Sequence, residues 1–205
     1  MTTPKPAGKP NPAIGALILA GGLATRMQGV DKGLVPFMGQ PLVTHLLPVL
    51  TPYCDWLGIS ANRNQDTYQA WAPTVFADAP AYAAQGPLAG LASAPAHLPA
   101  LDWLVVLPCD TPMLPPDLIP RFLAAADARP HVLAWYADTD DGPQPSIMLL
   151  RPQTLASLPD YLARGERTLR GFLAQHQAQA LHFPETEAFA NGNRPQDLAR
   201  MAAQE

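Results

Sequence analysis

Cysteine, charge and long apolar runs are all scarce in this sequence, and each scarcity excludes a class of protein. Two cysteines, Cys54 and Cys109, are too few for a disulfide framework and too far apart for a zinc cluster. Only 15% of the 205 residues are charged, and the 13 Lys and Arg are scattered, which argues against a nucleic-acid binder. No apolar run approaches the length of a membrane span, so no membrane partner is expected.

The start of the chain lacks the features of a targeting segment. Residues 1–13 contain Lys5, Lys9 and several prolines but no apolar stretch, a composition typical of a disordered leader and not of a signal peptide. We therefore expect a cytoplasmic protein. The remaining residues, 14–205, suffice for one large domain, and neither a repeat nor a linker divides them.

Apolar runs alternate with helical patterns in the first half of the chain. The runs that predict strands are residues 14–19, 55–61, 74–77 and 101–107, with helices expected at 42–50 and 66–71. This β-α-β-α-β order favours a parallel α/β sheet with right-handed crossovers. The continuous run 101–107 is the clearest strand, so we expect it at the centre of the sheet.

The second half predicts further elements with less detail. Helices are expected at 117–126, 155–162 and 169–172, strands at 131–136 and 144–150, and a last helix opened by Pro195. The acidic segment 138–142 lacks the downstream Glu of a calcium-binding loop, which favours a solvated turn.

A glycine-rich loop follows the first predicted strand, with the sequence L-A-G-G-L-A-T-R-M-Q-G-V-D-K over residues 19–32. Gly21 and Gly22 permit a tight turn and close approach of a ligand to the backbone. Arg26 and Lys32 add two cations suited to phosphate oxygens. The loop is therefore typical of a polyphosphate cradle, although it has neither G-x-G-x-x-G nor P-loop spacing. For the Gly-Gly pair alone, a simple turn with solvated cations is an equal alternative.

An acid stands directly after the strand expected at the centre of the sheet. Asp110 lies in the segment P-C-D-T-P, and ligands of open α/β sheets bind at the carboxyl ends of strands. The alternative role, an N-cap for the next helix, is less favoured because Asp110 lies too far upstream of that helix.

The motif L-A-G-G-x-x-x-R-M-x-G-x-D-K resembles that of the nucleotidyltransferases similar to sugar-phosphate nucleotidylyltransferases, and within them the molybdenum cofactor guanylyltransferases. The segments G-P-L-A-G, C-D-x-P and N-x-N-x-P follow in the family's order, so the resemblance spans residues 14–198. It implies a three-layer Rossmann-like α/β nucleotidyltransferase domain with a mostly parallel central sheet. It also implies transfer of GMP from GTP to the terminal phosphate of molybdopterin, with release of pyrophosphate. Proteins of molybdenum cofactor biosynthesis and acceptor proteins are the partners implied.

The resemblance further implies a set of site residues. The catalytic residues implied are Arg26, Lys32 and Asp110. The cofactor implied is Mg²⁺, held by Asp110 with Asn193 as a second oxygen ligand. The nucleotide contacts implied are Leu19, Ala20, Gly21, Gly22, Lys32, Ser60, Asn62, Asp78, Gly86, Pro87 and Asp110.

Several features leave alternatives open. Gly21 favours GTP, because cytidylyltransferase relatives have L-A-A-G here, but Ser60 stands where the family often has Asn, and Thr168 where it often has Arg. Asn191 and Asn193 also suit a simple turn. The alternative functions are a cytidylyl- or sugar-phosphate nucleotidyltransferase, a nucleotide-binding module that releases no pyrophosphate, and an NTP hydrolase. The last is least favoured, since no residue stands out for positioning water.

Overall fold

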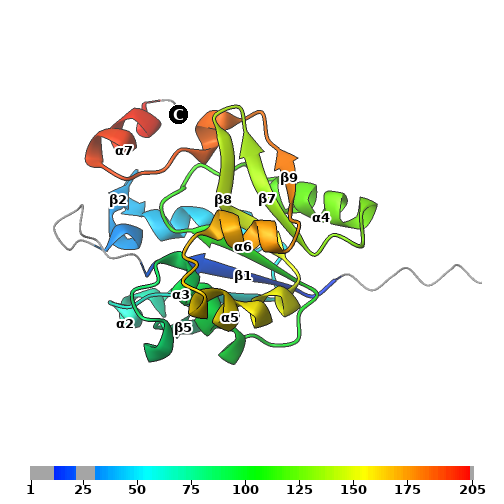
Figure 1. Ribbon diagram of the computed structural model, residues 1–205. Coiled ribbons are helices and arrows are strands. Elements are labelled where there is room, and N and C mark those ends of the chain that lie inside the picture. Colours follow the sequence, from blue (N-terminus) through cyan, green and yellow to red (C-terminus); the bar gives the residue numbers. More distant parts are fainter. Residues whose placement is uncertain (1–11, 22–30, 204–205) are drawn as a thin grey trace, which may run out of the picture.

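The computed structural model describes residues 12–21 and 31–203, and within them a seven-stranded sheet lies between two layers of helices (Figure 1). The strands of the sheet are β1 (Ile14–Leu19), β4 (Trp56–Ser60), β5 (Thr74–Phe76), β6 (Trp103–Pro108), β7 (Ala134–Thr139), β8 (Gly142–Leu150) and β9 (Gln179–His182). A separate hairpin is formed by β2 (Pro36–Phe37) and β3 (Gln40–Pro41). The α-helices are α1 (Leu47–Leu50), α2 (Gln65–Tyr68), α3 (Pro87–Ser93), α4 (Leu118–Ala128), α5 (Leu158–Ala163), α6 (Leu169–Gln175) and α7 (Pro195–Ala202).

The sheet has the strand order β5-β4-β1-β6-β8-β7-β9. The strands β5, β4, β1 and β6 are mutually parallel, whereas β8 is antiparallel to both of its neighbours, and β9 is parallel to β7. The predicted α/β fold with a mostly parallel central sheet is confirmed, and β6 occupies the middle position. Because β4 and β6 pair with opposite edges of β1, the chain changes direction across the sheet at β1.

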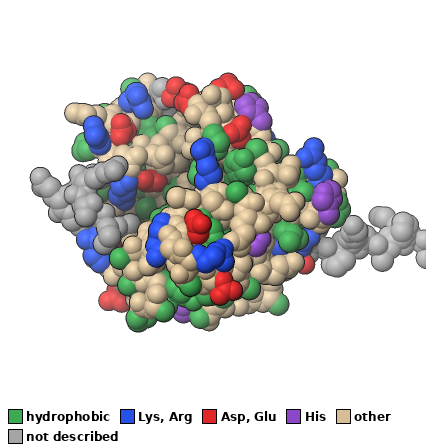
Figure 2. Space-filling model, viewed as in Figure 1, with side chains coloured by type: hydrophobic (Ala, Val, Ile, Leu, Met, Phe, Trp, Pro, Cys, Tyr) green, Lys and Arg blue, Asp and Glu red, His purple; other side chains and the backbone are tan. Residues whose placement is uncertain are grey.

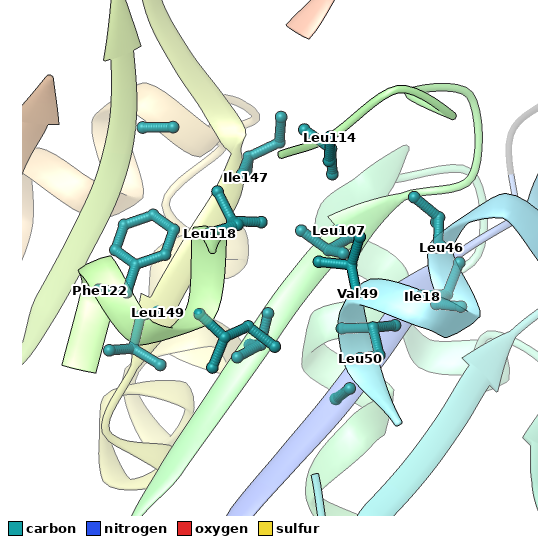
Figure 3. Packing of buried hydrophobic residues seen from close by; sticks show 14 of the residues in the cluster. Ile18, Leu46, Val49, Leu50, Leu107, Leu114, Leu118, Phe122, Ile147 and Leu149 are labelled. Carbon is teal, nitrogen blue, oxygen red and sulfur yellow. The ribbon is translucent and has the colours of Figure 1, made fainter. Parts of the chain in front are cut away.

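The core is divided between the two faces of the sheet, since successive side chains of a strand point to opposite faces. Ile18 and Leu149 belong to the cluster that packs against α1 and α4 (Figure 3). Their neighbours Leu17 and Met148 belong to the cluster beneath α3, α5 and α6, the helices on the other face (Figure 1). Both faces are therefore covered by helices, which explains the continuous apolar character of β1 and β6.

Two predicted helices are each divided into a 3₁₀ helix and a short α-helix. Over 42–50, a 3₁₀ helix at Leu42–Leu46 precedes α1, and Pro48 lies in the first turn of α1. Over 155–162, a 3₁₀ helix at Pro152–Ser157 precedes α5, again with a proline in the first turn of the α-helix. Proline lacks the N–H that a continuous helix needs and is tolerated only in the first turn, which explains both divisions.

The predicted strand at 131–136 was placed three residues too early. In the structure β7 begins at Ala134, because the Val132 N–H bonds to the Arg129 carbonyl oxygen at 3.0 Å and closes a turn there. The predicted acidic turn is shorter than 138–142, since β7 continues to Thr139 and β8 begins at Gly142. The edge strand β9 was not predicted, because its four residues Q-A-L-H carry no apolar run.

The helix α7 packs on the β2–β3 hairpin and not on the large sheet. Leu198 and Met201 of α7 form a small cluster with Phe37 and Leu42.

Figure 2 shows basic and acidic side chains interspersed over one face of the molecule. Within residues 12–21 and 31–203, no helix is both long and apolar enough to cross a membrane.

The packing of Phe122 provides a test of the core. Its side chain is 0% exposed and lies in the core near Leu118 and Leu149 (Figure 3), and its ring centroid is 5.6 Å from that of Phe183. We expect Phe122→Ala to lower the free energy of unfolding by about 3–5 kcal/mol, because it removes buried surface and leaves a cavity. Urea denaturation measures this loss.

Met38→Ala is the control for the Phe122 variant. Met38 is 52% exposed, so its truncation is expected to change stability by less than about 0.5 kcal/mol. Equal losses in the two variants would contradict the assigned core.

Candidate active site

Three parallel strands end on one line and create the floor of a cavity. Leu19 at the end of β1 pairs with Ser60 at the end of β4 and with Pro108 at the end of β6. The Ala20 N–H bonds to the Ser60 carbonyl oxygen at 2.8 Å, and the Cys109 N–H to that of Leu19 at 3.1 Å, so the alignment continues into the loops. A cavity of about 350 Å³ opens over this edge, where open α/β sheets bind their ligands.

Most of the predicted site residues share this cavity. Those lining it are Leu19, Ala20, Gly21, Lys32, Ser60, Asp78, Gly86, Pro87, Asp110 and Asn193. Asn62 contacts two of them through hydrogen bonds. Gly22 and Arg26 lie outside the described residues, as do residues 1–11 of the predicted leader. The chemical role of each site residue remains a prediction.

Lys32 links two segments that are distant in the sequence. Its ammonium donates to Oδ2 of Asp110 at 3.0 Å and also to Oδ1 of Asn193. The side chains of Lys32 and Asp110 are 29% and 14% exposed, so this ion pair is partly shielded from water. The sequence analysis assigned Lys32 to phosphate binding, and Asp110 and Asn193 to a metal. In the structure Lys32 contacts both of the other residues.

A second group of polar side chains forms around Asp78, in the loop after β5. The Asn62 amide donates to Oδ2 of Asp78 at 2.7 Å and to the Gly21 carbonyl oxygen at 3.1 Å. In return, the Asp78 backbone N–H donates to Oδ1 of Asn62 at 2.9 Å. The hydroxyl of Ser60 lies 3.4 Å from the other carboxylate oxygen of Asp78. Asn62 thereby fixes the carboxylate of Asp78 at the cavity and ties it to the glycine-rich loop.

The start of α3 forms another wall of the cavity. Gly86 precedes the helix with φ +61° and ψ −145°, a conformation available essentially to glycine alone. Pro87 takes the first turn of α3, as predicted. Gly90 faces Ser60, and a Cβ at Gly90 would lie 2.6 Å from the Ser60 hydroxyl oxygen. The small residue is therefore needed for α3 to approach the end of β4.

The oxygen donors of the cavity suit a hard cation. The Asp110 carboxylate and the Asn193 amide oxygen already converge on one cation, the Lys32 ammonium. Carboxylate and amide oxygens are ligands that Mg²⁺ accepts, usually with substrate phosphates and water completing its shell. Within residues 12–21 and 31–203, no group of three or more His, Cys, Asp or Glu could hold a metal. These residues therefore fit Mg²⁺ only as a partial ligand set.

Some lining residues were not predicted as site residues. They are Gly90, Pro108, Cys109, Ser146 and Asn191. Asn191 carried a signal in the N-x-N motif, and the Gly192 N–H of that motif bonds to the Asp110 carbonyl oxygen at 2.8 Å. Ser146 comes from β8, whose antiparallel placement beside β6 could not be derived from the residues alone.

Comparison with known proteins identifies one family, both from the family model that matches the chain and from similar sequences. Residues 16–180 match the family described as the MobA-like NTP transferase domain. The chain is 42% identical over 194 residues to a molybdenum cofactor guanylyltransferase of Shewanella frigidimarina, covering 94% of this chain and 97% of that protein.

Solved structures share the fold at low sequence identity. The molybdopterin-guanine dinucleotide biosynthesis protein A of Archaeoglobus fulgidus superposes with a TM-score of 0.68 at 20% identity, covering 93% of this chain and 97% of that one. The 4-diphosphocytidyl-2C-methyl-D-erythritol synthase of Anaerococcus prevotii gives 0.72 at 12% identity, covering 95% and 99%. Proteins whose names refer to different nucleotides thus share this fold.

The thiol of Cys109 provides a test of how closed the cavity floor is. Burial raises the pKa of the Cys109 thiol, and the carboxylates of Asp110 and Asp31 raise it further. Burial, with the Asp55 carboxylate, raises the pKa of Cys54 to about 12. At pH 8 we expect iodoacetamide to alkylate both cysteines at least about 100-fold more slowly than in the urea-unfolded chain, because the thiolate is the reactive form. Peptide mass spectrometry measures both rates. Equal rates at Cys109 in the folded and unfolded chain would contradict its burial.

Proposed function

The chain belongs to the MobA-like NTP transferase family, and from this premise we propose that it transfers GMP from GTP to the terminal phosphate of molybdopterin, releasing pyrophosphate. It is a nucleotidyltransferase, and the proposal concerns which donor and which acceptor it uses. The observation that supports the proposal best is the single cavity that contains Gly21, Lys32, Asp78 and Asp110 at the ends of parallel strands.

The reaction makes few demands on side-chain chemistry. The attacking phosphate oxygen of the acceptor is already ionised, so no Ser, Cys or His base is required. The demands are in-line placement of the two phosphates and compensation of their negative charge. A cavity with one lysine, two carboxylates and several amide and backbone groups is consistent with these demands.

Lys32 and Asp110 are proposed to act on the phosphates in different ways. An ammonium has three N–H donors, so Lys32 can bond a phosphate oxygen while two donors stay on Asp110 and Asn193. Asp110 uses Oδ2 for Lys32, which leaves its Oδ1 to hold Mg²⁺. The Asn193 amide oxygen already accepts from Lys32, and its second lone pair would be the further ligand. The bound ion supplies positive charge that offsets the triphosphate and the departing pyrophosphate.

Asp78 is proposed to select guanine. Guanine presents two adjacent N–H donors on its Watson–Crick edge, and a carboxylate held at a fixed angle can accept both. The Asp78 carboxylate is held by Asn62, and Asp78 lines the cavity, where a carboxylate oxygen can accept more than one hydrogen bond. Cytosine offers one amino donor beside two acceptors, which a carboxylate would repel.

The first functional prediction is that GTP is the preferred donor. We expect kcat/KM for GTP to exceed that for CTP by at least about 100-fold, because CTP leaves a carboxylate facing acceptor atoms. Pyrophosphate release from each NTP, with and without molybdopterin, measures the preference. Equal or faster turnover with CTP would contradict this prediction and favour the cytidylyltransferase alternative.

Gly21→Ala tests the same preference through the contact between Gly21 and Asn62. A Cβ at Gly21 would lie 3.1 Å from Nδ2 of Asn62 and 3.7 Å from Oδ1 of Asp78. We expect the added methyl group to displace the Asn62 amide and to lower the GTP-to-CTP ratio. An unchanged ratio would locate base selection away from Asp78.

The next prediction concerns Asp110. Asp110→Asn keeps one oxygen towards Lys32 but removes the charge proposed to hold Mg²⁺, so we expect transfer to fall at least about 100-fold. The melting temperature is expected to change by less than about 4 °C, since a partly exposed ion pair contributes little to stability. Pyrophosphate release across a magnesium titration and a melting curve measure the two effects.

Asp102→Asn is the matched control. Asp102 stands just before β6, at the opposite end of the strand, and pairs with Arg151 at 3.9 Å. This variant is expected to keep normal transfer. Full activity of Asp110→Asn at ordinary magnesium would remove Asp110 from the mechanism, and a collapsed melting temperature would make it a structural residue.

A further inference from the structure

A buried carboxylate directly before Lys32 has no role in the proposed reaction. Asp31 is only 9% exposed, and its backbone carbonyl accepts the Leu34 N–H at 3.1 Å in the turn that contains Lys32. Its Oδ1 accepts the Tyr68 hydroxyl at 2.5 Å, and its Oδ2 accepts the Asn64 amide at 3.0 Å. Both donors come from the segment of α2, more than 30 residues further along the chain.

The contact between α2 and this turn depends on three unusual positions. Tyr68 is 0% exposed, so its hydroxyl has few partners other than Asp31. Gly33 lies over that hydroxyl, and a Cβ at Gly33 would be 2.4 Å from the Tyr68 oxygen. Asn64 adopts φ +52°, a left-handed conformation that places its amide before the first turn of α2. A buried carboxylate is stable only when hydrogen bonds compensate it, and here both donors come from one element.

We propose that Tyr68 and Asn64 are positioning residues, which act through Asp31 to hold the Lys32 ammonium in the cavity for the donor phosphates. This inference rests on the proposed function, because it assumes that Lys32 binds phosphate. Asp31 and Lys32 are consecutive, so fixing the Asp31 carboxylate fixes the backbone from which the lysine side chain extends. The other end of that side chain is held by Asp110 and Asn193. The lysine is therefore restrained at its base by α2 and at its tip by the loops after β6 and before α7.

The phenol of Tyr68 is suited to this role because it remains a donor. Burial raises the pKa of the Tyr68 hydroxyl, and the hydrogen bond to the Asp31 carboxylate raises it further. The hydroxyl of Tyr68 is therefore protonated at neutral pH and can donate to the Asp31 carboxylate.

The alternative is that Tyr68 is only a core residue, and a matched tyrosine separates the two roles. Tyr161 is 3% exposed, donates its hydroxyl to the Thr168 carbonyl oxygen at 2.9 Å, and lies over Gly171, whose added Cβ would be 2.3 Å from it. It belongs to the cluster on the opposite face of the sheet. Tyr161→Phe therefore removes a hydrogen bond of a core tyrosine, here to a backbone carbonyl oxygen, without touching Asp31.

The experiment measures GTP and CTP binding by calorimetry in the full-length protein. It compares the unchanged chain with Tyr68→Phe, Lys32→Ala, the double variant and Tyr161→Phe. We expect Tyr68→Phe to weaken binding of the preferred nucleotide about fivefold to tenfold, and Lys32→Ala to weaken it more. The double variant is expected to match Lys32→Ala within about twofold, because a residue that acts through Lys32 has no effect once Lys32 is absent. Tyr161→Phe should bind nucleotide normally, although it too removes a hydrogen bond of a core tyrosine.

Asn64→Gly provides a second variant, since glycine accepts φ +52° while losing the amide that bonds Asp31. It should weaken nucleotide binding in the same Lys32-dependent way. Independent, multiplicative effects of Tyr68→Phe and Lys32→Ala would overturn the positioning role, as would equal weakening by Tyr161→Phe. If Lys32→Ala weakens binding and Tyr68→Phe does not, the inference fails while the proposed function stands. If Lys32→Ala binds nucleotide normally, the phosphate role of Lys32 fails, and the positioning role fails with it.

Discussion

The register of β1 between β4 and β6 is the constraint on which the site depends. Leu19 pairs with Ser60 on one side and with Pro108 on the other, so three strands end at the same level. A shift of two residues in either pairing would keep the buried faces inside but would move a loop by more than 6 Å along the sheet. The segments that contain Lys32 and Asp110 meet because the core of the sheet sets this register, and Asp78 joins them because Phe76 at the end of β5 pairs with Ser60.

Because these strands end at the same level, the Lys32 ammonium and the Asp110 carboxylate lie close enough to compensate each other's charge. Asp110 and Lys32 come from loops after neighbouring strands, and Asn193 from the segment before α7 completes the set. The lysine lies among oxygen acceptors, at a site where its charge is partly shielded from water. Charge-assisted hydrogen bonds in such surroundings are stronger than those on an open surface, so small displacements of the ammonium have large energetic effects.

The sequence was sufficient for the elements that bear continuous patterns and insufficient for those that depend on distant contacts. The strands β1 and β6 have unbroken apolar runs, and Pro87 and Pro195 stand in the first turns of α3 and α7, as predicted. The strand β9, whose residues show no apolar run, was not predicted, and the antiparallel placement of β8 next to β6 could not be derived from its residues. The place of Asp110 at the cavity was predictable, because it follows a central strand and ligands of open α/β sheets bind at the carboxyl ends of strands. The role of Asp31 was not, since its partner Tyr68 is 37 residues away and looks like an ordinary core residue.

Two glycines, Gly33 and Gly90, allow helices to pack closely against the segments that carry the site residues. Gly90 lets α3 approach Ser60, and Gly33 leaves room for the Tyr68 hydroxyl, so each removes a side chain where a helix meets the cavity. Neither glycine has a left-handed backbone that would require it, and the need in both cases is for space. Side chains that bind a ligand must be held within a fraction of an ångström, and loops alone do not supply such precision. The helix α2 thus packs on the turn that contains Lys32, and α3 packs on the end of β4 and bonds through Ser93 to the Ala79 N–H, next to Asp78. Each of the two groups proposed to select and orient the nucleotide is therefore held against a helix of the core.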